Sequence, residues 1–295
     1  MKKTTITSTV KSGKILVSDG AWGTFLHQKG LQAGSCPELW NLTRPDDVQD
    51  IARSYIHVGA DMIKTNSLGG TSIKLAHFGL DNQVSEINEA AARLSREIAG
   101  DDHWVIASVG PTGKMLLMGD VTEEELYEAF KTQVIALEKG GADAVCIETM
   151  SDPDEALLAI KAAKENTSLE IICTFTFDAI GENEYRTIMG NSPAEIAIAC
   201  INAGADIIGT NCGNGLEKMI PIVAQMREVA PDKPILVHAN AGLPEIKNGE
   251  LIYPDTPEQI KPLIPQIINA GAQIIGGCCG TTPAHIAIIR EAVSH

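Results

Sequence analysis

A short motif that joins the end of a helix to the start of a buried strand occurs four times in this chain. The copies span residues 57–63, 139–145, 202–208 and 269–275, and three of them share the run Gly-Ala-Asp before two apolar residues. Each copy reads as a helix that ends at glycine, a tight turn and an apolar strand. A helix-to-strand junction that recurs in this way indicates a chain built from repeated βα units.

The repeated units can be extended to eight predicted strands with helices between them. The strands are expected at residues 14–18, 60–66, 104–109, 142–148, 170–175, 205–211, 234–240 and 272–277. Several are continuous apolar runs, which is typical of parallel strands covered on both faces. Helix starts are predicted at Pro45, at the capping box that opens with Thr122, and at the prolines that follow Asp152, Ser192 and Thr256.

This alternation predicts an α/β fold, a single (βα)8 TIM barrel. The alternative is an open doubly wound sheet, which the absence of a Gly-x-Gly-x-x-Gly run after the first strand disfavours. Residues 1–10 are interpreted as a polar N-terminal extension and residues 11–295 as the barrel. Four long segments, 27–43, 110–121, 177–191 and 241–255, are expected to be irregular. Each follows a strand, so all four should lie on the C-terminal face, where barrel active sites are built.

Composition excludes several classes of protein. The formal net charge of −15 argues against binding to nucleic acid or to an anionic membrane, because both require basic patches. The first ten residues lack the apolar core of a signal peptide, and no apolar run approaches the length of a transmembrane helix. The seven cysteines are odd in number and irregularly spaced, which predicts a reducing, cytoplasmic location.

Three of the cysteines stand at the ends of predicted strands. Cys212 follows one apolar run, and Cys278 and Cys279 follow another that ends in paired glycines. Both strand ends should share the mouth of the barrel, where three converging thiolates would form a tetrahedral zinc site with one open position. A disulfide between Cys278 and Cys279 is the main alternative. The remaining cysteines are given no chemical role: Cys146, Cys173 and Cys200 fit apolar patterns, and Cys36 lies in a loop where it could be exposed.

Polar residues follow other predicted strands at the same face. Asp19 should point its carboxylate at the mouth, although it could equally serve as a turn cap. Glu148 lies among apolar neighbours and therefore needs a cationic partner, so the two acids together could hold the ammonium group of a substrate. Asn66 and Asn240 are either turn formers or site residues, and Asn240 could supply a labile metal ligand.

These segments together resemble the homocysteine S-methyltransferase family, and within it the homocysteine-binding module of cobalamin-dependent methionine synthases. The resemblance extends from about residue 11 to the C-terminus. It is carried by Asp19-Gly-Ala-Trp-Gly-Thr, Thr65-Asn66, Gly110-Pro-Thr-Gly, Glu148-Thr149, Asn211-Cys212, Asn240-Ala-Gly and Gly277-Cys-Cys-Gly-Thr-Thr-Pro.

The resemblance implies a function for most of these residues. It implies Zn²⁺ held by Cys212, Cys278 and Cys279, with Asn240 in the fourth position until a thiol arrives. It also implies that Asp19 and Glu148 bind the amino group of homocysteine and that the amides of Gly20 and Ala21 help bind its carboxylate. Asn66 is predicted to be a further substrate-binding residue. Zinc would convert the thiol to a thiolate that remains nucleophilic toward a methyl donor.

The methyl donor is not specified by these residues. No folate-binding, cobalamin-binding or reactivation module is recognised in the chain, so a methyl-corrinoid on a separate protein is the favoured donor. We expect that protein to dock on the apolar loop 114–119, through Met115 and Leu116, although these side chains could equally pack on the top of the barrel. S-methylmethionine, S-adenosylmethionine and a betaine remain possible donors. Two other functions stay open: demethylation of a small methylated compound toward a corrinoid protein, and a non-catalytic zinc-binding subunit.

Overall fold

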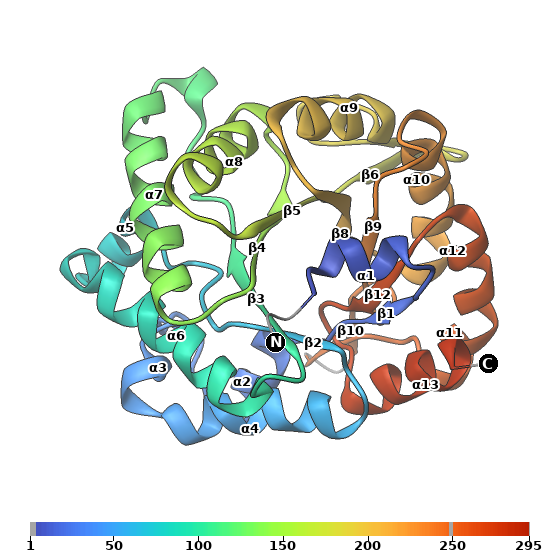
Figure 1. The fold of residues 1–295 in the computed structure, drawn as a ribbon, viewed down its shortest axis with the longest axis horizontal. Coiled ribbons are helices and arrows are strands. Elements are labelled where there is room, and N and C mark those ends of the chain that lie inside the picture. The colour runs from blue at the N-terminus through green and yellow to red at the C-terminus, as the bar shows by residue number, and fades with distance from the viewer. Residues whose placement is uncertain (1–3, 248–249, 295) are drawn as a thin grey trace.

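Eight parallel strands close into a barrel in the computed structural model, which describes residues 4–247 and 250–294 (Figure 1). Their order is β1-β12-β9-β8-β5-β4-β3-β2, and a parallel bridge between Ser18 and Met62 joins the first strand to the last. The strands are β1 (Leu16–Val17), β2 (Met62–Lys64), β3 (Trp104–Val109), β4 (Ala144–Met150), β5 (Glu170–Phe175), β8 (Ile207–Gly215), β9 (Ile235–Asn240) and β12 (Ile274–Gly277). The predicted (βα)8 TIM barrel is confirmed.

Helices surround the barrel (Figure 1). They are α1 (Ile6–Lys11), α2 (Gly23–Gln28), α3 (Trp40–Thr43), α4 (Pro45–His57), α5 (Ser72–Leu75), α6 (Val84–Ala99), α7 (Glu123–Lys139), α8 (Pro153–Asn166), α9 (Pro193–Ala203), α10 (Leu216–Val229), α11 (Pro257–Ile260), α12 (Ile264–Ala270) and α13 (Pro283–Val293), with four 3₁₀ turns, η1 (Ala76–Phe78), η2 (Asp81–Gln83), η3 (Leu116–Met118) and η4 (Lys261–Leu263). The predicted capping box at Thr122 is present, and the helices predicted to start after Ser192 and Thr256 prove to have capping boxes as well. Capping signals therefore located the helix starts correctly.

The four segments expected to be irregular contain short regular elements, which corrects that prediction. Segment 177–191 holds the antiparallel hairpin β6 (Asp178–Gly181) and β7 (Glu184–Arg186), and segment 241–255 holds β10 (Glu245–Lys247) and β11 (Glu250–Ile252). Segment 27–43 ends in α3, and segment 110–121 contains η3. Asn183 takes a φ of 56°, the left-handed conformation that a tight hairpin turn requires. Residues 248–249 lie outside the described part of the chain.

The repeated junction depends on glycine and on a carboxylate. Gly59, Gly141, Gly204 and Gly271 all have positive φ, between 95° and 121°. Only glycine adopts this backbone without strain, which explains its presence in every copy. The aspartate that follows reaches the neighbouring strand: Asp61 accepts a hydrogen bond from the Val17 amide at 2.7 Å, and Asp206 accepts one from the Ile171 amide at 2.9 Å. In these copies the aspartate therefore helps to fix where the strand starts relative to its neighbour.

Helix α1 closes the N-terminal end of the barrel. Its Ile6 and Val10 side chains are buried against inward-facing residues at the lower ends of the strands, among them Trp104. The Glu170 carboxylate accepts hydrogen bonds from the amides of Ile6 and Thr7 at 2.6 and 2.9 Å, which satisfies the N-terminus of the helix. The segment expected to be a polar extension thus contributes to the core, apart from residues 1–3, which lie outside the described range.

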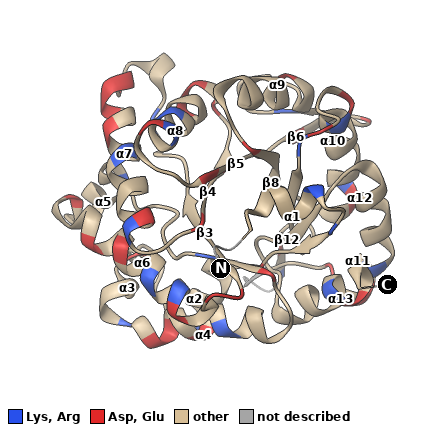
Figure 2. Ribbon diagram, in the orientation of Figure 1, with Lys and Arg blue, Asp and Glu red and all other residues tan. Residues whose placement is uncertain are grey.

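Charged residues are rare in the barrel strands and common on the helices and loops around them (Figure 2). The eight strands contain three charged residues, Lys64, Glu148 and Glu170. Glu170 binds the N-terminus of α1 at the lower end of the barrel. Lys64 and Glu148 are therefore the charged strand residues that lie at the mouth. In the described part of the chain, no helix combines the length and the hydropathy that crossing a membrane requires.

Candidate metal and substrate site

Three cysteine sulfurs converge at the C-terminal mouth of the barrel. The sulfurs of Cys212, Cys278 and Cys279 lie within 4.8 Å of one another. The Sγ–Sγ distance is 3.9 Å from Cys212 to Cys279 and 4.0 Å from Cys278 to Cys279, and all three thiols are free. Strands β8 and β12 are separated by β9 in the sheet, so the barrel itself brings these side chains together.

An unusual backbone conformation turns Cys212 toward the other two cysteines. Its φ is 58°, a left-handed value that costs an L-residue energy, and Thr149 on β4 shares it with a φ of 63°. The register of β8 against β9 also shifts between Asn211 and Gly215. The Asn211 amide holds the arrangement: its Oδ1 accepts from the Thr149 amide at 2.7 Å and its Nδ2 donates to the Thr149 hydroxyl at 2.8 Å. Asn211 therefore supports both strained residues at once.

The turn after β12 fixes Cys278 and Cys279. The Cys278 amide donates to the Ala239 carbonyl at 2.7 Å, and the Ala241 amide donates to the Cys279 carbonyl at 2.9 Å. The Thr281 hydroxyl donates to the Cys278 carbonyl at 2.7 Å. Two backbone hydrogen bonds and the Thr281 hydroxyl together fix this turn, in which the two vicinal sulfurs lie 4.0 Å apart.

Asn240 lies at the end of β9, between Ala239 and Ala241, whose backbone groups hydrogen-bond to Cys278 and Cys279. Its Oδ1 is buried and has no hydrogen-bond partner among the described residues. A buried carbonyl oxygen without a partner is costly, so this atom has capacity to accept a further donor or a cation. Asn240 lines a separate small cavity and is not among the described residues that line the cavity beside the sulfurs. The three thiols by themselves fit the ligands that a tetrahedral Zn²⁺ takes.

The three thiols differ in acidity even without a metal. Hydrogen bonds from the Cys212 and Cys278 thiols lower the pKa of Cys279 to about 2, although burial opposes this. Hydrogen bonding to Cys212 and Cys279, together with burial, raises the pKa of Cys278. The cluster thus favours a thiolate at Cys279.

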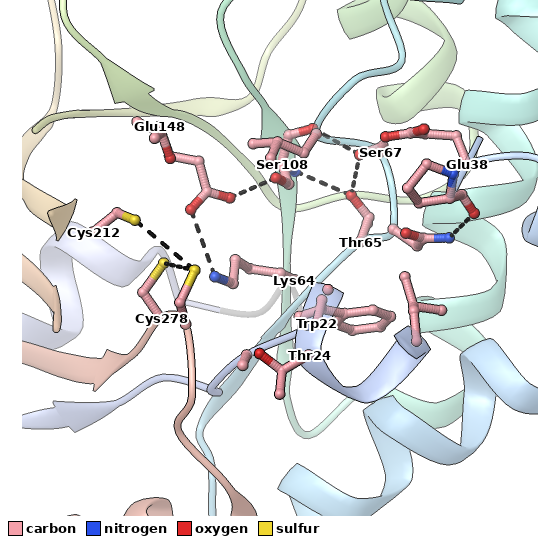
Figure 3. Close-up of a pocket in the computed structure, with 18 residues that line it drawn as sticks. Trp22, Thr24, Glu38, Lys64, Thr65, Ser67, Ser108, Glu148, Cys212 and Cys278 are labelled. Carbon is pink, nitrogen blue, oxygen red and sulfur yellow. Dashed lines mark hydrogen bonds and ion pairs between the residues drawn. The ribbon is translucent and has the colours of Figure 1, made fainter. Parts of the chain in front are cut away.

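A cavity of about 280 Å³ opens beside the sulfurs (Figure 3). This volume suits a small ligand rather than a large cofactor. Its lining comes from the C-terminal ends of six strands and the segments after them: Ala21, Trp22, Gly23, Thr24, Leu26, Pro37, Glu38, Lys64, Thr65, Asn66, Ser67, Leu68, Ser108, Glu148, Thr149, Cys212, Cys278 and Cys279.

Glu148 has the cationic partner that its sequence context required. Its Oε2 lies 3.5 Å from Nζ of Lys64, and both side chains are more than nine-tenths buried. Its Oε1 accepts a hydrogen bond of 2.5 Å from the Ser108 hydroxyl. Burial alone would lower the pKa of Lys64, but the carboxylates of Glu148 and Asp19 outweigh it and raise that pKa, so the amine stays charged.

Asp19 lies behind the cavity wall. Its side chain is fully buried and is not among the described residues that line the cavity. Its Oδ2 accepts hydrogen bonds from the Trp22 indole and from the Lys64 amide, both at 2.7 Å. Burial is the main reason that the pKa of Asp19 rises to about 6.

The segment after Asp19 is also engaged with protein groups. The Ala21 amide donates to the Thr281 hydroxyl at 3.0 Å, and the Ala21 carbonyl accepts from the Tyr55 hydroxyl at 2.7 Å. A Cβ atom on Gly20 would lie 2.8 Å from both the Thr281 and the Tyr55 hydroxyl oxygens, so glycine is required for this close packing.

The structure also shows the surroundings of Asn66 and Cys36. Asn66 lines the cavity, but its Nδ2 donates to the Pro37 carbonyl at 2.7 Å, so its amide supports the wall. Cys36, whose exposure the sequence left open, is buried, and its thiol lies 3.4 Å from Oε2 of Glu38. Burial raises the pKa of Cys36 to about 11. Cys146, Cys173 and Cys200 are buried, as predicted.

Sequence reasoning missed Lys64, Ser108 and Glu38. A signal for Lys64 was present: a lysine in an otherwise apolar strand that is covered on both faces must find a negative partner. Nothing comparable marks Ser108 or Glu38, because a serine in a strand and a glutamate in a loop are common in positions without function.

The sequence of this chain is similar to part of two methionine synthases. The chain is 29% identical over 310 residues to a methionine synthase of Mycobacterium tuberculosis and 30% identical over 306 residues to that of Mycobacterium leprae. These matches cover 97% and 95% of this chain but 25% and 24% of those proteins, so the chain spans about a quarter of the length of these relatives.

The fold also matches a solved enzyme. The metallated form of the homocysteine methyltransferase MmuM from Escherichia coli superimposes with a TM-score of 0.78 at 23% identity, covering 96% of this chain and 98% of that one. A sequence model of the family described as homocysteine S-methyltransferase matches residues 16–293. Because that match takes in all eight barrel strands and the three-cysteine cluster, the chain belongs to the homocysteine S-methyltransferase family.

Proposed function

We propose that this chain is a zinc-dependent S-methyltransferase that methylates a small thiol, with homocysteine as the acceptor and methionine as the product. The observation that carries the proposal is the convergence of Cys212, Cys278 and Cys279 within 4.8 Å at the edge of a cavity of about 280 Å³. Membership in the homocysteine S-methyltransferase family supports the acceptor.

The three cysteines would hold the zinc ion, and Asn240 would occupy the fourth position until the thiol replaces it. Bound zinc lowers the pKa of a thiol ligand and keeps it a nucleophilic thiolate at neutral pH. In the transfer, the thiol would release its proton to solvent water, and a sulfur electron pair would form the new S–CH₃ bond. The bond between the methyl group and the donor breaks, and the leaving group keeps its electrons. The chain's contribution is to orient the acceptor in the cavity.

The donor that we favour is a methyl-corrinoid carried by a separate protein. Exposed apolar side chains support this choice, because they lie in segments that follow the barrel strands, on the face where the cavity opens. They are Leu117 (78% exposed), Met118 (73%), Ile180 (60%), Ile188 (73%) and Ile246 (78%). Exposed apolar residues that gather on one face are typical of a partner surface.

The test measures both the zinc content of the protein and its methyltransferase activity. We expect about one zinc per chain and methionine formation from homocysteine and methylcobalamin. Cys279→Ala should remove the activity, whereas Cys200→Ala, a buried cysteine outside the cluster, should retain it. Zinc without turnover on this donor would direct the search to S-methylmethionine, S-adenosylmethionine or a betaine, and then to the demethylating direction. Protein purified without chelators that contains no zinc would refute the proposal.

A further inference from the structure

The charges around the cavity are unevenly distributed. Among the described residues that line it, Lys64 is the one cation, and Glu38 and Glu148 are the anions. The Glu38 carboxylate is already engaged, since its Oε1 accepts from the Gly69 amide at 2.7 Å and its Oε2 lies 3.4 Å from the Cys36 sulfur. Lys64 and Glu148 are therefore the charges best placed to meet a ligand.

Lys64 projects inward from β2 toward the sulfurs. Figure 3 shows its amino group joined by a dashed line to the Glu148 carboxylate, on the side of the pocket where Cys212 and Cys278 lie. Its 3.5 Å separation from Glu148 is longer than an ordinary N–H···O hydrogen bond, and no hydrogen bond from this amino group is found within the described part of the chain. An ammonium group has three donors, so Lys64 retains capacity to bind an anion from the cavity.

The groups expected to bind the acceptor's carboxylate are less available than Lys64. The Ala21 amide donates to Thr281 at 3.0 Å, and Gly20 is not among the described residues that line the cavity. Asp19, the second residue expected to bind the ammonium group, is buried with its Oδ2 accepting two hydrogen bonds. The binding groups that remain accessible are a cation and a carboxylate, side by side.

We propose that Lys64 binds the carboxylate of the thiol acceptor, so that the site selects short thiols that carry a carboxylate. The inference rests on the proposed function, because it places the acceptor's sulfur at the cysteine cluster. An acceptor with an ammonium group, such as homocysteine, then inserts its two charges between Lys64 and Glu148. Each buried charge keeps a partner of opposite sign, which avoids the cost of leaving either unpaired.

A different role for Lys64 would give a different result. If its charge only offsets the thiolates and Glu148, its removal should weaken the binding of every thiol to the same extent. A carboxylate-binding role instead predicts that the effect depends on the charged groups of the acceptor. Binding measured without a methyl donor separates the two, and it does not depend on which donor is correct.

The experiment measures dissociation constants by isothermal titration calorimetry on the zinc-loaded protein. The ligands are homocysteine, γ-mercaptobutyrate, which lacks the amino group, and aminopropanethiol, which lacks the carboxylate. We expect Lys64→Met to weaken the first two by about tenfold or more and aminopropanethiol by less than about threefold. Lys74→Met, a lysine outside the cavity, is the matched control and should change none of them.

The outcomes are distinct. Equal weakening of all three thiols, or no change, would overturn the role of Lys64 and leave the proposed function standing. Failure of the wild-type protein to bind any of them would overturn the proposed function and this inference with it. Should Lys64→Met not fold, the double variant Lys64→Met/Glu148→Gln removes both charges of the pair together. It should bind γ-mercaptobutyrate as weakly as expected for the single variant, and retained tight binding would contradict the inference.

Discussion

Lys64 and Glu148 face each other across the mouth of the barrel, 3.5 Å apart, from strands that are not neighbours. Strand β3 lies between β2 and β4, and its Ser108 donates to the same glutamate at 2.5 Å. The pair is thus held by three consecutive strands. The pair lines the same cavity as Cys212, Cys278 and Cys279, so in the proposed function it would bind the acceptor whose sulfur reaches the metal.

The first prediction concerns the other half of this pair. Replacing Glu148→Gln removes the negative charge but keeps an acceptor for the Ser108 hydroxyl. Binding of homocysteine and of aminopropanethiol to the zinc-loaded protein should weaken by about tenfold, because both lose the partner of their ammonium group. Binding of γ-mercaptobutyrate should be unchanged or tighter, since Lys64 no longer has a competing anion. Calorimetry measures all three, and weaker γ-mercaptobutyrate binding would contradict the assignment.

The second prediction uses the left-handed backbone of Cys212, whose φ is 58°. Both Cys212→Gly and Cys212→Ala should lose zinc, because each removes a proposed ligand. In the presence of a chelator, however, the glycine variant should be more stable than the alanine variant by about 1 kcal/mol, since only glycine adopts this conformation without strain. Urea denaturation measures the difference. Equal stabilities would show that the loop relaxes once the sulfur is gone.

Much of the fold could be predicted from local patterns. Strands at 104–109 and 170–175 were located to the residue, and the junction glycines were recognised because their φ leaves few other residues possible. The role of α1 was not predictable, because Thr4 to Val10 is mostly polar and only tertiary structure shows that Ile6 and Val10 face the barrel interior.

The candidate site could be predicted from the sequence only in part, because the burial of its side chains depends on the tertiary structure. Cysteines at strand ends are unusual enough to indicate a metal site, and the structure brings these three together. By contrast, the accessibility of a carboxylate depends on which atoms surround it. Asp19 and Glu148 look equivalent in sequence, but Asp19 is fully buried behind the wall whereas Glu148 lines the cavity.

The third prediction follows from the pKa of Asp19, which burial raises from 3.8 to about 6. The folded protein binds this proton more tightly than the unfolded chain does. The stabilisation from the protonated form is therefore complete below about pH 4 and is lost as the pH rises through about 6. Asp19→Asn keeps an oxygen acceptor for Trp22 and for the Lys64 amide but cannot titrate. The difference in unfolding free energy, wild type minus variant, should fall over this range by about 3 kcal/mol, as measured by urea denaturation. A constant difference would contradict the raised pKa.

The last prediction tests where a protein donor docks. The sequence pointed to Met115 and Leu116, but both are half-buried and Leu116 packs against the core, whereas Leu117 and Met118 are 78% and 73% exposed. The double variant Leu117→Ser/Met118→Ser should therefore reduce methyl transfer from a methyl-corrinoid protein by about tenfold or more, while transfer from free methylcobalamin is retained. Ile135→Ser, which changes an apolar residue on α7 with 42% exposure, is the matched control and should reduce neither. Because free methylcobalamin needs no docking surface, equal losses with both donors would show that this loop supports the cavity rather than a partner.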